Sequence, residues 1–412
     1  MRVLVVNIFF DPYSFGGATV VAERMAHELS RSHGWEVTAL AVRFANLPAV
    51  STVRYRTKYG FDAFNVGMPF LPDRDYEAHF RNPYFAQPFR RIVDFVRPDV
   101  VHLHCIQEMD AGIIDMLAER GIPVAVTVHD FWWLCERQFM INLQGNYCAQ
   151  RRIDYDICAA CSGERARVER RGEYLKAQLA KADLILPVSE FTRGMLLDND
   201  LPVDRMVVNR NGVQEPGPAY VPRRRSRKPG GPLHFGFIGG PGPIKGWDLI
   251  AKAFSLLDRN TYRLLAIDAG AAIGCSWRAD LEKAAAGLSL EVLPSYNAET
   301  LDETFSRFDV LLAPSRWKET FGLAVREALI RDIWVIASDG GGLAEDIRQG
   351  VNGNVLPFPP TVEALRKAVE GRIEAGFHAA FDTSYVTTVD GAAKELSGLL
   401  AGMIKAPEVA RA

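Results

Sequence analysis

Short apolar runs that alternate with helical patterns are the feature that most constrains the fold of this chain. Val3–Val6 form one such run, residues 20–33 then repeat apolar side chains at helical spacing, and residues 37–42 form a second run. Continuous apolar runs are typical of parallel strands that helices cover on both faces. The first half is therefore predicted to be a doubly wound α/β sheet. Further runs are residues 100–104, 124–128 and 184–188.

The alternation is interrupted over residues 215–232, where proline, glycine and arginine dominate, as is typical of a linker. A second series of apolar runs follows, and two Rossmann-like halves predict a cleft that the carboxyl ends of the strands face. We expect a first domain over 1–214, a second over 233–380, and a helical segment over 381–412 that packs back on the first. The later runs are 234–238, 262–267, 290–293, 309–313 and 334–337.

Composition narrows the class of protein. A chain of 412 residues allows two or three domains at roughly 150 residues each. Lys and Arg number 48 against 50 Asp and Glu, a formal charge of -2, which argues against a globally basic nucleic-acid binder. A hydrophobic fraction of 48% with 10% aromatics excludes disorder as the main state.

The sequence also bears on location. No apolar run reaches the roughly 18 residues of a spanning helix, and residues 1–6 enter a strand-like run without the small-residue cleavage region of a signal peptide. We therefore expect the protein to be made and kept in the cytoplasm.

The first glycine-rich loop, residues 11–18, follows the first expected strand and precedes the first expected helix. Gly16 and Gly17 let a ligand approach the backbone, and the helix N-terminus offers unpaired N–H groups. A plain strand-to-helix turn is the alternative. The loop lacks G-x-G-x-x-G spacing, so a nicotinamide or flavin dinucleotide site is disfavoured.

A second loop, residues 236–246, includes Gly239 and brings Lys245 toward the expected cleft. Lysine can neutralise a diphosphate as a point charge, whereas a solvated loop lysine is the alternative. The loop lacks the Gly-Lys-Ser/Thr ending of a P-loop. A third turn, residues 338–346, could set backbone N–H groups against a phosphate or sugar, or serve only as a turn.

Two glutamates follow the run at 309–313, with Glu319 expected before the next helix and Glu327 within it. Were the segment helical, eight steps would rise about 12 Å and return to nearly the same face. That spacing suits two contacts along one elongated ligand and is too wide for carboxylates that share a proton. A solvated helix face is the alternative, but the place after a strand end favours a ligand.

In this order, the pieces resemble GT-B-fold retaining glycosyltransferases of the large family 4, the group 1 type. The resemblance runs through most of the chain. It implies two Rossmann-like domains facing a cleft, and transfer of a sugar, with retention, from a nucleoside-diphosphate sugar. The acceptor would be a glycan or lipid-linked molecule in cell-surface polysaccharide synthesis. The pieces that carry the resemblance are residues 15–18, 127–130, 182–189, 211–213, 245–246 and 319–346.

The resemblance also implies roles for single residues. The second domain would bind the sugar nucleotide, with Glu319 on the donor sugar, Glu327 on the ribose and Lys245 on the diphosphate. Backbone groups would meet the sugar and phosphates from the second domain, and the first glycine loop would close on the diphosphate. The remaining positions expected to contact the donor are Gly16, Gly17, Gly239, Phe321, Gly322 and Leu323.

One position departs from the family pattern. Many relatives carry an arginine where this chain has residues 239–241, Gly-Gly-Pro. Diphosphate charge would then rest on Lys245, helix N-termini and another cation such as Arg316. His129 is expected to touch the sugar or phosphate, with a hydrogen-bonded core histidine as the alternative, and His104 is a weaker acceptor-side candidate. Because the resemblance is to GT-B enzymes rather than to GT-A enzymes with their Asp-x-Asp metal motif, we expect no essential divalent ion.

Four cysteines fall within a loop expected at 130–165, spaced C-x12-C-x9-C-x2-C. Four thiolates suit tetrahedral zinc or an iron–sulfur cluster, and in a cytoplasmic enzyme a metal outranks a disulfide. Unligated thiols are the alternative. A metal here would be a structural clip near the acceptor site. The four are Cys135, Cys148, Cys158 and Cys161, while Cys105 and Cys275 are expected to be buried thiols.

Basic residues gather at 151–181 and in the linker. A solvated surface is the plain interpretation, and attraction to anionic headgroups at the inner face of the cell membrane is the alternative for a lipid-linked acceptor. The linker cations are Arg223, Arg224, Arg225, Arg227 and Lys228.

Two rival functions stay open at this point. A GT-B-fold sugar-nucleotide epimerase would need no acceptor. A non-catalytic nucleotide-sugar-binding subunit would bind donor without turnover, although the intact pair of Glu319 and Glu327 argues against it. No nucleic-acid partner is expected.

Overall fold

The computed structural model describes residues 1–45, 49–69, 76–226 and 231–405, and the chain divides into two compact units. The first domain boundary lies at residue 212 rather than 214, and residues 381–388, expected with the C-terminal segment, are part of the second unit. Unit 1 comprises Met1–Met140, Ala149–Gly212 and Val389–Ala412, and unit 2 comprises Ile141–Cys148 and Val213–Thr388.

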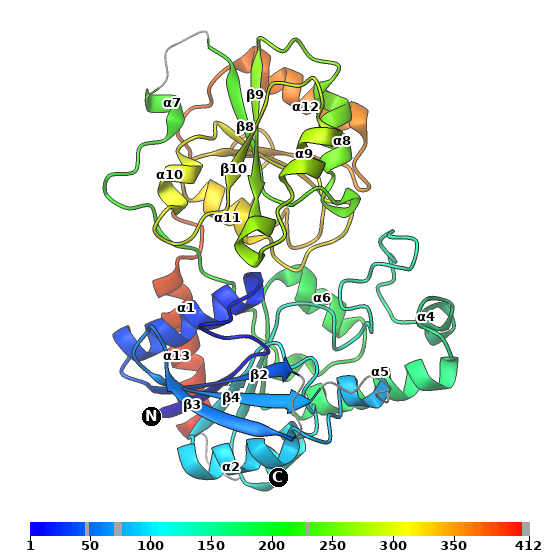
Figure 1. Cartoon of the computed structure of the whole chain (residues 1–412), viewed down its shortest axis with the longest axis vertical. Helices are drawn as coiled ribbons and strands as arrows, with labels where there is room; N and C mark the ends of the chain where they lie inside the picture. Colours follow the sequence, from blue (N-terminus) through cyan, green and yellow to red (C-terminus); the bar gives the residue numbers. More distant parts are fainter. Residues whose placement is uncertain (46–48, 70–75, 227–230, 406–412) are drawn as a thin grey trace. The chain divides into compact units, whose positions relative to one another are not determined.

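Unit 1 is built on the strands β1 (Arg2–Val6), β2 (Glu36–Ala45), β3 (Ser51–Arg56), β4 (Asp62–Pro69), β5 (Val100–Leu103), β6 (Val124–Val128) and β7 (Leu184–Pro187). They form one sheet in the order β3-β4-β2-β1-β5-β6-β7, parallel except for the β3–β4 pair (Figure 1). Every residue of β5, β6 and β7 is buried, as expected of strands that are covered on both faces. The predicted parallel sheet is confirmed.

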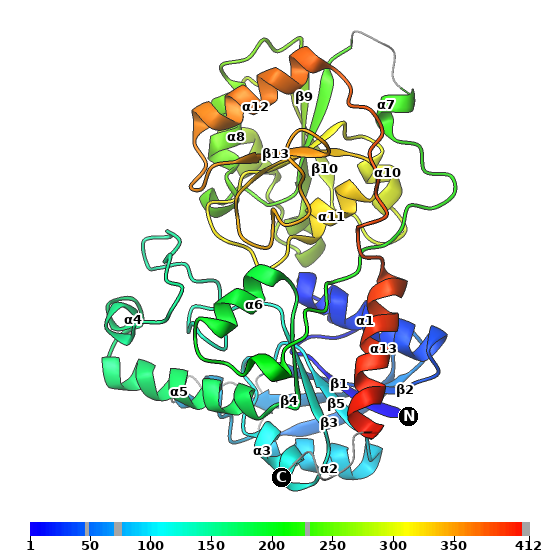
Figure 2. The ribbon, with the colours of Figure 1, turned by 180° about the vertical axis from the view of Figure 1, so that it is seen from behind.

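The helices of unit 1 are α1 (Gly17–Ser32), α2 (Ala86–Val96), α3 (Ile113–Glu119), α4 (Tyr155–Ser162), α5 (Arg165–Lys181), α6 (Glu190–Leu197) and α13 (Val389–Lys405), with short 3-10 turns at Tyr76–His79 and Val203–Arg205. Helices α1 and α13 lie side by side, and α2 lies on the other side of the sheet from α1 (Figures 1 and 2). Trp35, which follows α1, donates its indole N–H to Ser397 Oγ of α13 at 2.9 Å. The C-terminal helix therefore completes the unit in which the chain begins.

The apolar pattern does not predict β3 and β4. Strand β3 is an exposed edge strand that carries Arg54 and Arg56, so no apolar run marks it. Charged side chains of this kind protect an edge strand from pairing with another chain. In β4, the partly buried Asn65 interrupts the buried residues, and Gly67 interrupts the apolar run. The residues with which β3 and β4 pair are therefore evident only in the folded sheet.

Unit 2 is built on the strands β8 (Leu233–Phe237), β9 (Tyr262–Asp268), β10 (Leu290–Pro294), β11 (Val310–Ala313), β12 (Trp334–Ser338) and β13 (Gly353–Leu356). They form a parallel sheet in the order β10-β9-β8-β11-β12-β13. Its helices are α7 (Arg223–Ser226), α8 (Trp247–Phe254), α9 (Arg278–Ala284), α10 (Leu301–Phe305), α11 (Leu323–Leu329) and α12 (Val362–Ala375), with 3-10 turns at Pro243–Lys245 and Ala269–Ile273.

Two hydrophobic cores cover the two faces of this sheet. In β9, Leu264 and Ala266 belong to the core that includes Trp247 of α8, whereas Leu265 and Ile267 belong to the other core. Because successive strand residues point to opposite faces, the cores lie on opposite sides of the sheet. The second half is therefore doubly wound, as predicted.

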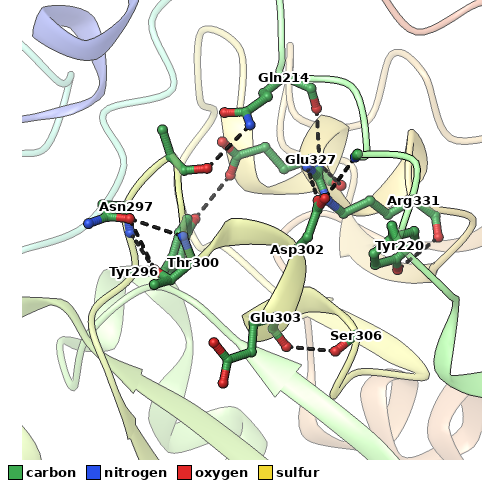
Figure 3. Close-up of polar contacts among 12 residues, drawn as sticks. Gln214, Tyr220, Tyr296, Asn297, Thr300, Asp302, Glu303, Ser306, Glu327 and Arg331 are labelled. Carbon is green, nitrogen blue, oxygen red and sulfur yellow. Dashed lines mark hydrogen bonds and ion pairs between the residues drawn. The ribbon is translucent and has the colours of Figure 1, made fainter.

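Part of the expected linker is packed on unit 2 through a buried arginine (Figure 3). Arg331, whose side chain is fully buried, donates to Asp302 Oδ1 at 2.8 Å and to the Gln214 carbonyl oxygen at 3.1 Å. The Gly217 N–H donates to the same carboxylate at 2.7 Å, and the Tyr220 hydroxyl donates to the Arg331 carbonyl at 3.1 Å. Residues 215–220, the first part of the expected linker, are thus held on unit 2, while residues 227–230 lie outside the described ranges.

We expect Arg331→Met to lower the free energy of unfolding of unit 2 by about 3 kcal/mol, because it leaves a partly buried Asp302 carboxylate and the Gln214 carbonyl without their donor. Urea unfolding followed by tryptophan fluorescence measures the change. Arg307→Met is the matched control: Arg307 forms a half-exposed pair with Glu291, and its loss should cost under about 1 kcal/mol. Equal costs for the two variants would contradict a special role for Arg331.

Candidate active site

The loop that carries Lys245 leaves the end of β8 and turns tightly against the end of β11. Pro243–Lys245 form a 3-10 turn, and Gly246 follows with φ of 82° before α8 begins. A Cβ atom at Gly246 would lie 2.3 Å from the Pro314 carbonyl oxygen. Glycine is therefore required both by the backbone conformation and by the close approach of the two loops.

This approach brings the predicted cation and the first predicted carboxylate together. Lys245 Nζ lies 2.8 Å from Glu319 Oε1, and the Ser315 hydroxyl donates to the same oxygen. The ammonium group also lies 5.1 Å from the centre of the Trp317 ring. The side chain of Glu319 is 13% exposed and that of Lys245 is 30% exposed, so a ligand can still reach the lysine.

Arg316, the alternative phosphate-binding cation, is occupied elsewhere. Its two terminal nitrogens donate to the two carboxylate oxygens of Asp248 at 2.6 and 2.7 Å, and it also donates to the Pro243 carbonyl at 3.0 Å. The Arg316 backbone N–H donates to the Ile244 carbonyl at 2.8 Å. Arg316 therefore fixes the loop that presents Lys245, and its fork is satisfied without a phosphate.

The third glycine turn is joined to the same place. The Glu319 N–H donates to the Gly340 carbonyl at 2.8 Å, and the Gly342 N–H donates to the Glu319 carbonyl at 2.9 Å. The Ser338 hydroxyl donates to the Ser315 carbonyl at 2.7 Å. Three predicted loops thus meet beyond the carboxyl ends of β8, β11 and β12, where parallel α/β sheets bind ligands.

The segment Phe321–Leu323 turns from Glu319 into α11. Gly322 has φ of 88°, and a Cβ atom there would lie 2.4 Å from the Leu343 side chain. The buried Arg326 donates to the Phe321 carbonyl, to the Leu343 carbonyl at 3.1 Å and to Asp346 Oδ2 at 2.7 Å. One arginine therefore ties this backbone to the third glycine turn.

The second glutamate, Glu327, lies within α11 and is buried. The Tyr296 hydroxyl donates to Glu327 Oε2 at 3.0 Å (Figure 3). As predicted, Glu319 precedes the helix, in backbone that forms a bridge with Gly341. Gly239, also predicted to contact the donor, lies where a Cβ atom would be 2.7 Å from the Phe237 ring.

In unit 1, the first glycine loop precedes α1. Gly16 has φ of 82° and caps the helix, and both Gly16 and Gly17 are exposed. The buried Asn7 holds the start of the loop, because its side-chain amide donates to the Phe9 carbonyl at 2.6 Å and to Thr19 Oγ1 at 3.1 Å. The backbone of the loop is therefore open to a ligand while its ends are fixed.

Three histidines of unit 1, the buried His102 and His104 and the partly buried His129, form a stack at the ends of β5 and β6. His104 Nδ1 lies 2.8 Å from His129 Nε2, and His102 Nε2 lies 2.7 Å from Thr127 Oγ1. His104 Nε2 is buried without a hydrogen-bond partner among the described residues. Since a buried N–H without an acceptor is especially costly, we assign the proton of His104 to Nδ1, which donates to His129 Nε2.

Burial keeps this stack neutral. It lowers the pKa of His102 to about 3 and that of His129 to about 4, and it lowers the pKa of His104 well below its usual range. Repulsion by His129 adds to the effect at His102 and His104. His129 therefore meets a ligand as a neutral imidazole whose Nε2 already accepts a hydrogen bond.

Two family models match the chain in succession. The model described as Glycosyltransferase Family 4 matches residues 15–215, and the model described as Glycosyl transferases group 1 matches residues 222–376. The chain belongs to the family 4, group 1 glycosyltransferases. The enzyme class predicted from the sequence resemblance is confirmed.

A curated relative supports the same class over part of the sequence. The D-inositol 3-phosphate glycosyltransferase of Geodermatophilus obscurus is 32% identical over 171 residues, which are 39% of this chain and 38% of the relative. The match thus spans about two fifths of the relative's length.

Solved structures show the GT-B fold for this glycosyltransferase. The catalytic domain of starch synthase IV from Arabidopsis thaliana, bound to ADP and acarbose, has a TM-score of 0.62 at 14% identity and covers 98% of this chain and 99% of its own. WaaG, a glycosyltransferase involved in lipopolysaccharide biosynthesis, has a TM-score of 0.57 at 15% identity and covers 99% of this chain and 98% of its own. The predicted two-domain fold is confirmed.

Several residues of the glycosyltransferase site are not predicted from the sequence. Ser315, Tyr296 and Arg326 contact the predicted site residues, yet hydroxyl and guanidinium groups at these positions have no distinctive spacing. Unit 2 brings Gly239, Lys245 and residues 319–323 around the same strand ends. The predicted residues Gly16, Gly17 and His129 belong to unit 1.

No disulfide joins any of the six cysteines of the glycosyltransferase, all of which lie in the described ranges. Burial raises the pKa of Cys135 to about 11, so this thiol is protonated at neutral pH. In the part of the chain that the structure describes, no three His, Cys, Asp or Glu side chains are arranged to hold a metal ion. The site of Cys135, Cys148, Cys158 and Cys161 stays a prediction that metal analysis of purified protein tests. Cys105 is buried as expected, whereas Cys275 is exposed.

Ion pairs neutralise much of the basic character seen in the sequence. In the linker, Arg223 and Arg224 pair with Asp309 and Asp332, while Arg227 and Lys228 lie outside the described residues. Among the helices that the structure describes, none combines the length and hydropathy needed to span a bilayer. The pairs within and around residues 151–181 include Arg151–Asp198, Arg152–Asp200, Arg165–Asp156, Lys176–Glu173 and Lys181–Asp115.

The histidine stack predicts a pH-dependent stability of unit 1. An unfolded histidine takes up a proton near pH 6.5, whereas His102 in the folded enzyme does not until about pH 3. The folded state is therefore not penalised by the neutral His102 above pH 6.5. As the pH falls below that value, the free energy of unfolding drops, by about 2 kcal/mol between pH 7 and pH 5. Urea unfolding of wild type and His102→Gln at both pH values measures the difference. An equal loss in both proteins would show that His102 is not its source.

Proposed function

We propose that this glycosyltransferase transfers a sugar from a nucleoside-diphosphate sugar, with retention of configuration, to a glycan or lipid-linked acceptor in cell-surface polysaccharide synthesis. The observation that carries the proposal is the contact of Lys245 with Glu319 beyond the strand ends of unit 2. A cation and a carboxylate side by side match the two ends of the bond that breaks. The departing diphosphate is negative and the sugar becomes cation-like.

Lys245 would stabilise the departing diphosphate. Charge that develops on a leaving group is stabilised most by a fixed donor that needs no rearrangement. The Lys245 loop is held by Arg316 and Gly246, and its ammonium stays partly exposed. In this proposal the diphosphate replaces Glu319 as the main partner of the lysine, and the freed Glu319 accepts hydrogen bonds from the donor sugar.

The remaining unit 2 residues would bind the rest of the donor. Glu327 would accept hydrogen bonds from the ribose hydroxyls, with its carboxylate oriented by Tyr296. Backbone N–H groups of Phe321, Gly322 and Leu323 would meet the sugar and phosphates, and Gly239 would let the donor approach the backbone. These roles come from the family resemblance and are compatible with the hydrogen bonds described above.

From unit 1, Gly16 and Gly17 would meet the diphosphate and His129 the sugar or phosphate. His129 Nε2 accepts the hydrogen bond from the N–H assigned to His104 Nδ1. His129 would therefore act as a neutral hydrogen-bonding group rather than as a cation. We propose no essential divalent ion, since Lys245 and backbone N–H groups would balance the diphosphate charge.

The relatives support the donor and acceptor classes. One structural neighbour is bound to ADP and acarbose, and another is involved in lipopolysaccharide biosynthesis. A lipid-linked acceptor would bring an otherwise cytoplasmic enzyme to the inner face of the cell membrane. The base and the sugar of the donor are open, and thermal stabilisation by UDP-, GDP- and ADP-sugars would identify them.

We expect Lys245→Ala and Glu319→Gln each to lower kcat/KM for sugar transfer by about 10²–10³-fold, because each removes a group that acts on the reacting bond. Lys252→Ala, an exposed lysine of α8, is the matched control and should retain activity. Turnover is measured with the stabilising donor and a glycan or lipid-linked acceptor, and thermal melting verifies folding.

Three outcomes of this assay would contradict the proposal. Normal turnover in both variants would show that neither Lys245 nor Glu319 takes part in the reaction. Product formed from the donor without acceptor would identify an epimerase. Donor binding without turnover under every acceptor condition would identify a nucleotide-sugar-binding subunit.

Tyr296→Phe tests the second glutamate. Loss of one hydrogen bond to Glu327 is worth about 1 kcal/mol, so the KM for the donor should rise about fivefold while kcat changes less. Tyr220→Phe, whose hydroxyl donates to the Arg331 carbonyl instead, should leave the donor KM unchanged. A fall in kcat with an unchanged donor KM would argue that Glu327 does not bind the ribose.

A further inference from the structure

A cavity of unit 2 lies away from the proposed donor site. It has a volume of about 770 Å³ and is bounded by α12, by the residues around β13 and by residues 378–385. Trp334, the first residue of β12, lines it, whereas the donor-site loops follow the last residues of β8, β11 and β12. The cavity therefore lies toward the opposite ends of these parallel strands, and its volume is typical of a small-molecule site.

Arg372 of α12 is the unusual residue of this cavity. It is 9% exposed, and its guanidinium lies 4.6 Å from the centre of the Trp334 ring. Its Nε atom is buried without a hydrogen-bond partner, and no ion pair joins Arg372 to any residue in the described ranges. Buried arginines are normally paired, because an unpaired buried charge is costly.

The other buried arginines of unit 2 emphasise the contrast. Arg326 and Arg331 are each 1% exposed, and each has a carboxylate partner, Asp346 and Asp302 respectively. Arg372 has the stacking contact but not the carboxylate. Burial also lowers its pKa, which reflects the cost of keeping the charge there.

The surroundings of the cavity favour an anion. Arg348 and Lys367 line it together with Arg372, against one lining carboxylate, Asp382. Lys367 also lies 3.5 Å from Glu363, and Arg348 is stacked on the Tyr385 ring at 4.4 Å. His378 is neutral, since burial and nearby arginines lower its pKa to about 4. The excess of positive charge matches a dianion better than a single carboxylate.

We propose that this cavity is a binding site for a small molecule with a phosphate group, which Arg372 holds through its guanidinium fork. A planar guanidinium donates two parallel hydrogen bonds to a phosphate, and the unpartnered Nε supplies one of the donors. The Trp334 ring fixes the plane of the fork. This site is separate from the donor site, and the proposal does not depend on the identity of the transferase reaction.

Inorganic phosphate is the first probe. Thermal unfolding of the full chain is followed as phosphate replaces chloride at constant ionic strength, up to tens of millimolar, with acetate as the carboxylate arm. We expect a saturable rise in Tm with phosphate and a weaker one with acetate. Arg372→Leu should weaken phosphate binding at least tenfold and leave the unliganded protein no less stable, because it removes an unpaired buried charge.

Two controls separate this site from other anion sites. Arg366→Leu removes a guanidinium from the same helix, but Arg366 already pairs with Glu363 and Glu370, so phosphate binding should persist. Lys245→Ala should likewise keep the phosphate effect. Loss of the effect in Lys245→Ala, with retention in Arg372→Leu, would assign phosphate to the donor site and overturn the proposal.

A second pair of variants leaves Arg372 in place. Gly371 lines the cavity, and a Cβ atom there would meet no atom within 4 Å. Gly371→Glu should place a carboxylate beside Arg372 and weaken phosphate binding at least tenfold, whereas Gly371→Gln should bind phosphate nearly as well as wild type. No saturable rise in wild-type Tm, or equal binding by Gly371→Glu and Gly371→Gln, would overturn the proposal.

Discussion

The contact between Lys245 and Glu319 depends on one backbone constraint, the close approach of the loop after β8 to the end of β11. Gly246 permits this approach, since any Cβ atom would collide with the Pro314 carbonyl. The bidentate pair of Arg316 with Asp248 then fixes the loop in place. The lysine side chain is long and flexible, so its ammonium group has a defined position only because the backbone is held firmly.

Buried arginines fix the other loops of unit 2 in a similar way. Arg326 ties the turn at Phe321 to the third glycine turn, and Arg331 holds residues 214–220 against α10 and α11. Each donates to backbone carbonyls and pairs with one carboxylate, which offsets the cost of burying the charge. Arg372 breaks this rule, and the exception is what points to a ligand rather than to a structural role.

The sequence predicts the parts of this molecule that depend on local pattern. Central strands such as Val124–Val128 are apolar on both faces, so their burial can be predicted from the sequence alone. The edge strand Ser51–Arg56 is polar and exposed, so it cannot be predicted in this way. Lys245 and Glu319 are identifiable as candidates from the loops that carry them. Their contact spans 74 positions, and the pairing of Arg316 with Asp248 spans 68, so neither partner can be inferred before the fold is known.

The Ser315 hydroxyl explains how an ion pair formed without ligand can coexist with donor binding. If Lys245 turned to a diphosphate and Glu319 lost its only partner, a carboxylate that is 13% exposed would be left uncompensated. Ser315 donates to the same oxygen, and the Glu319 backbone is pinned on both sides by Gly340 and Gly342. In the proposed reaction Glu319 therefore keeps one hydrogen bond and its position while the lysine changes partner, so the exchange costs less than breaking an isolated buried pair.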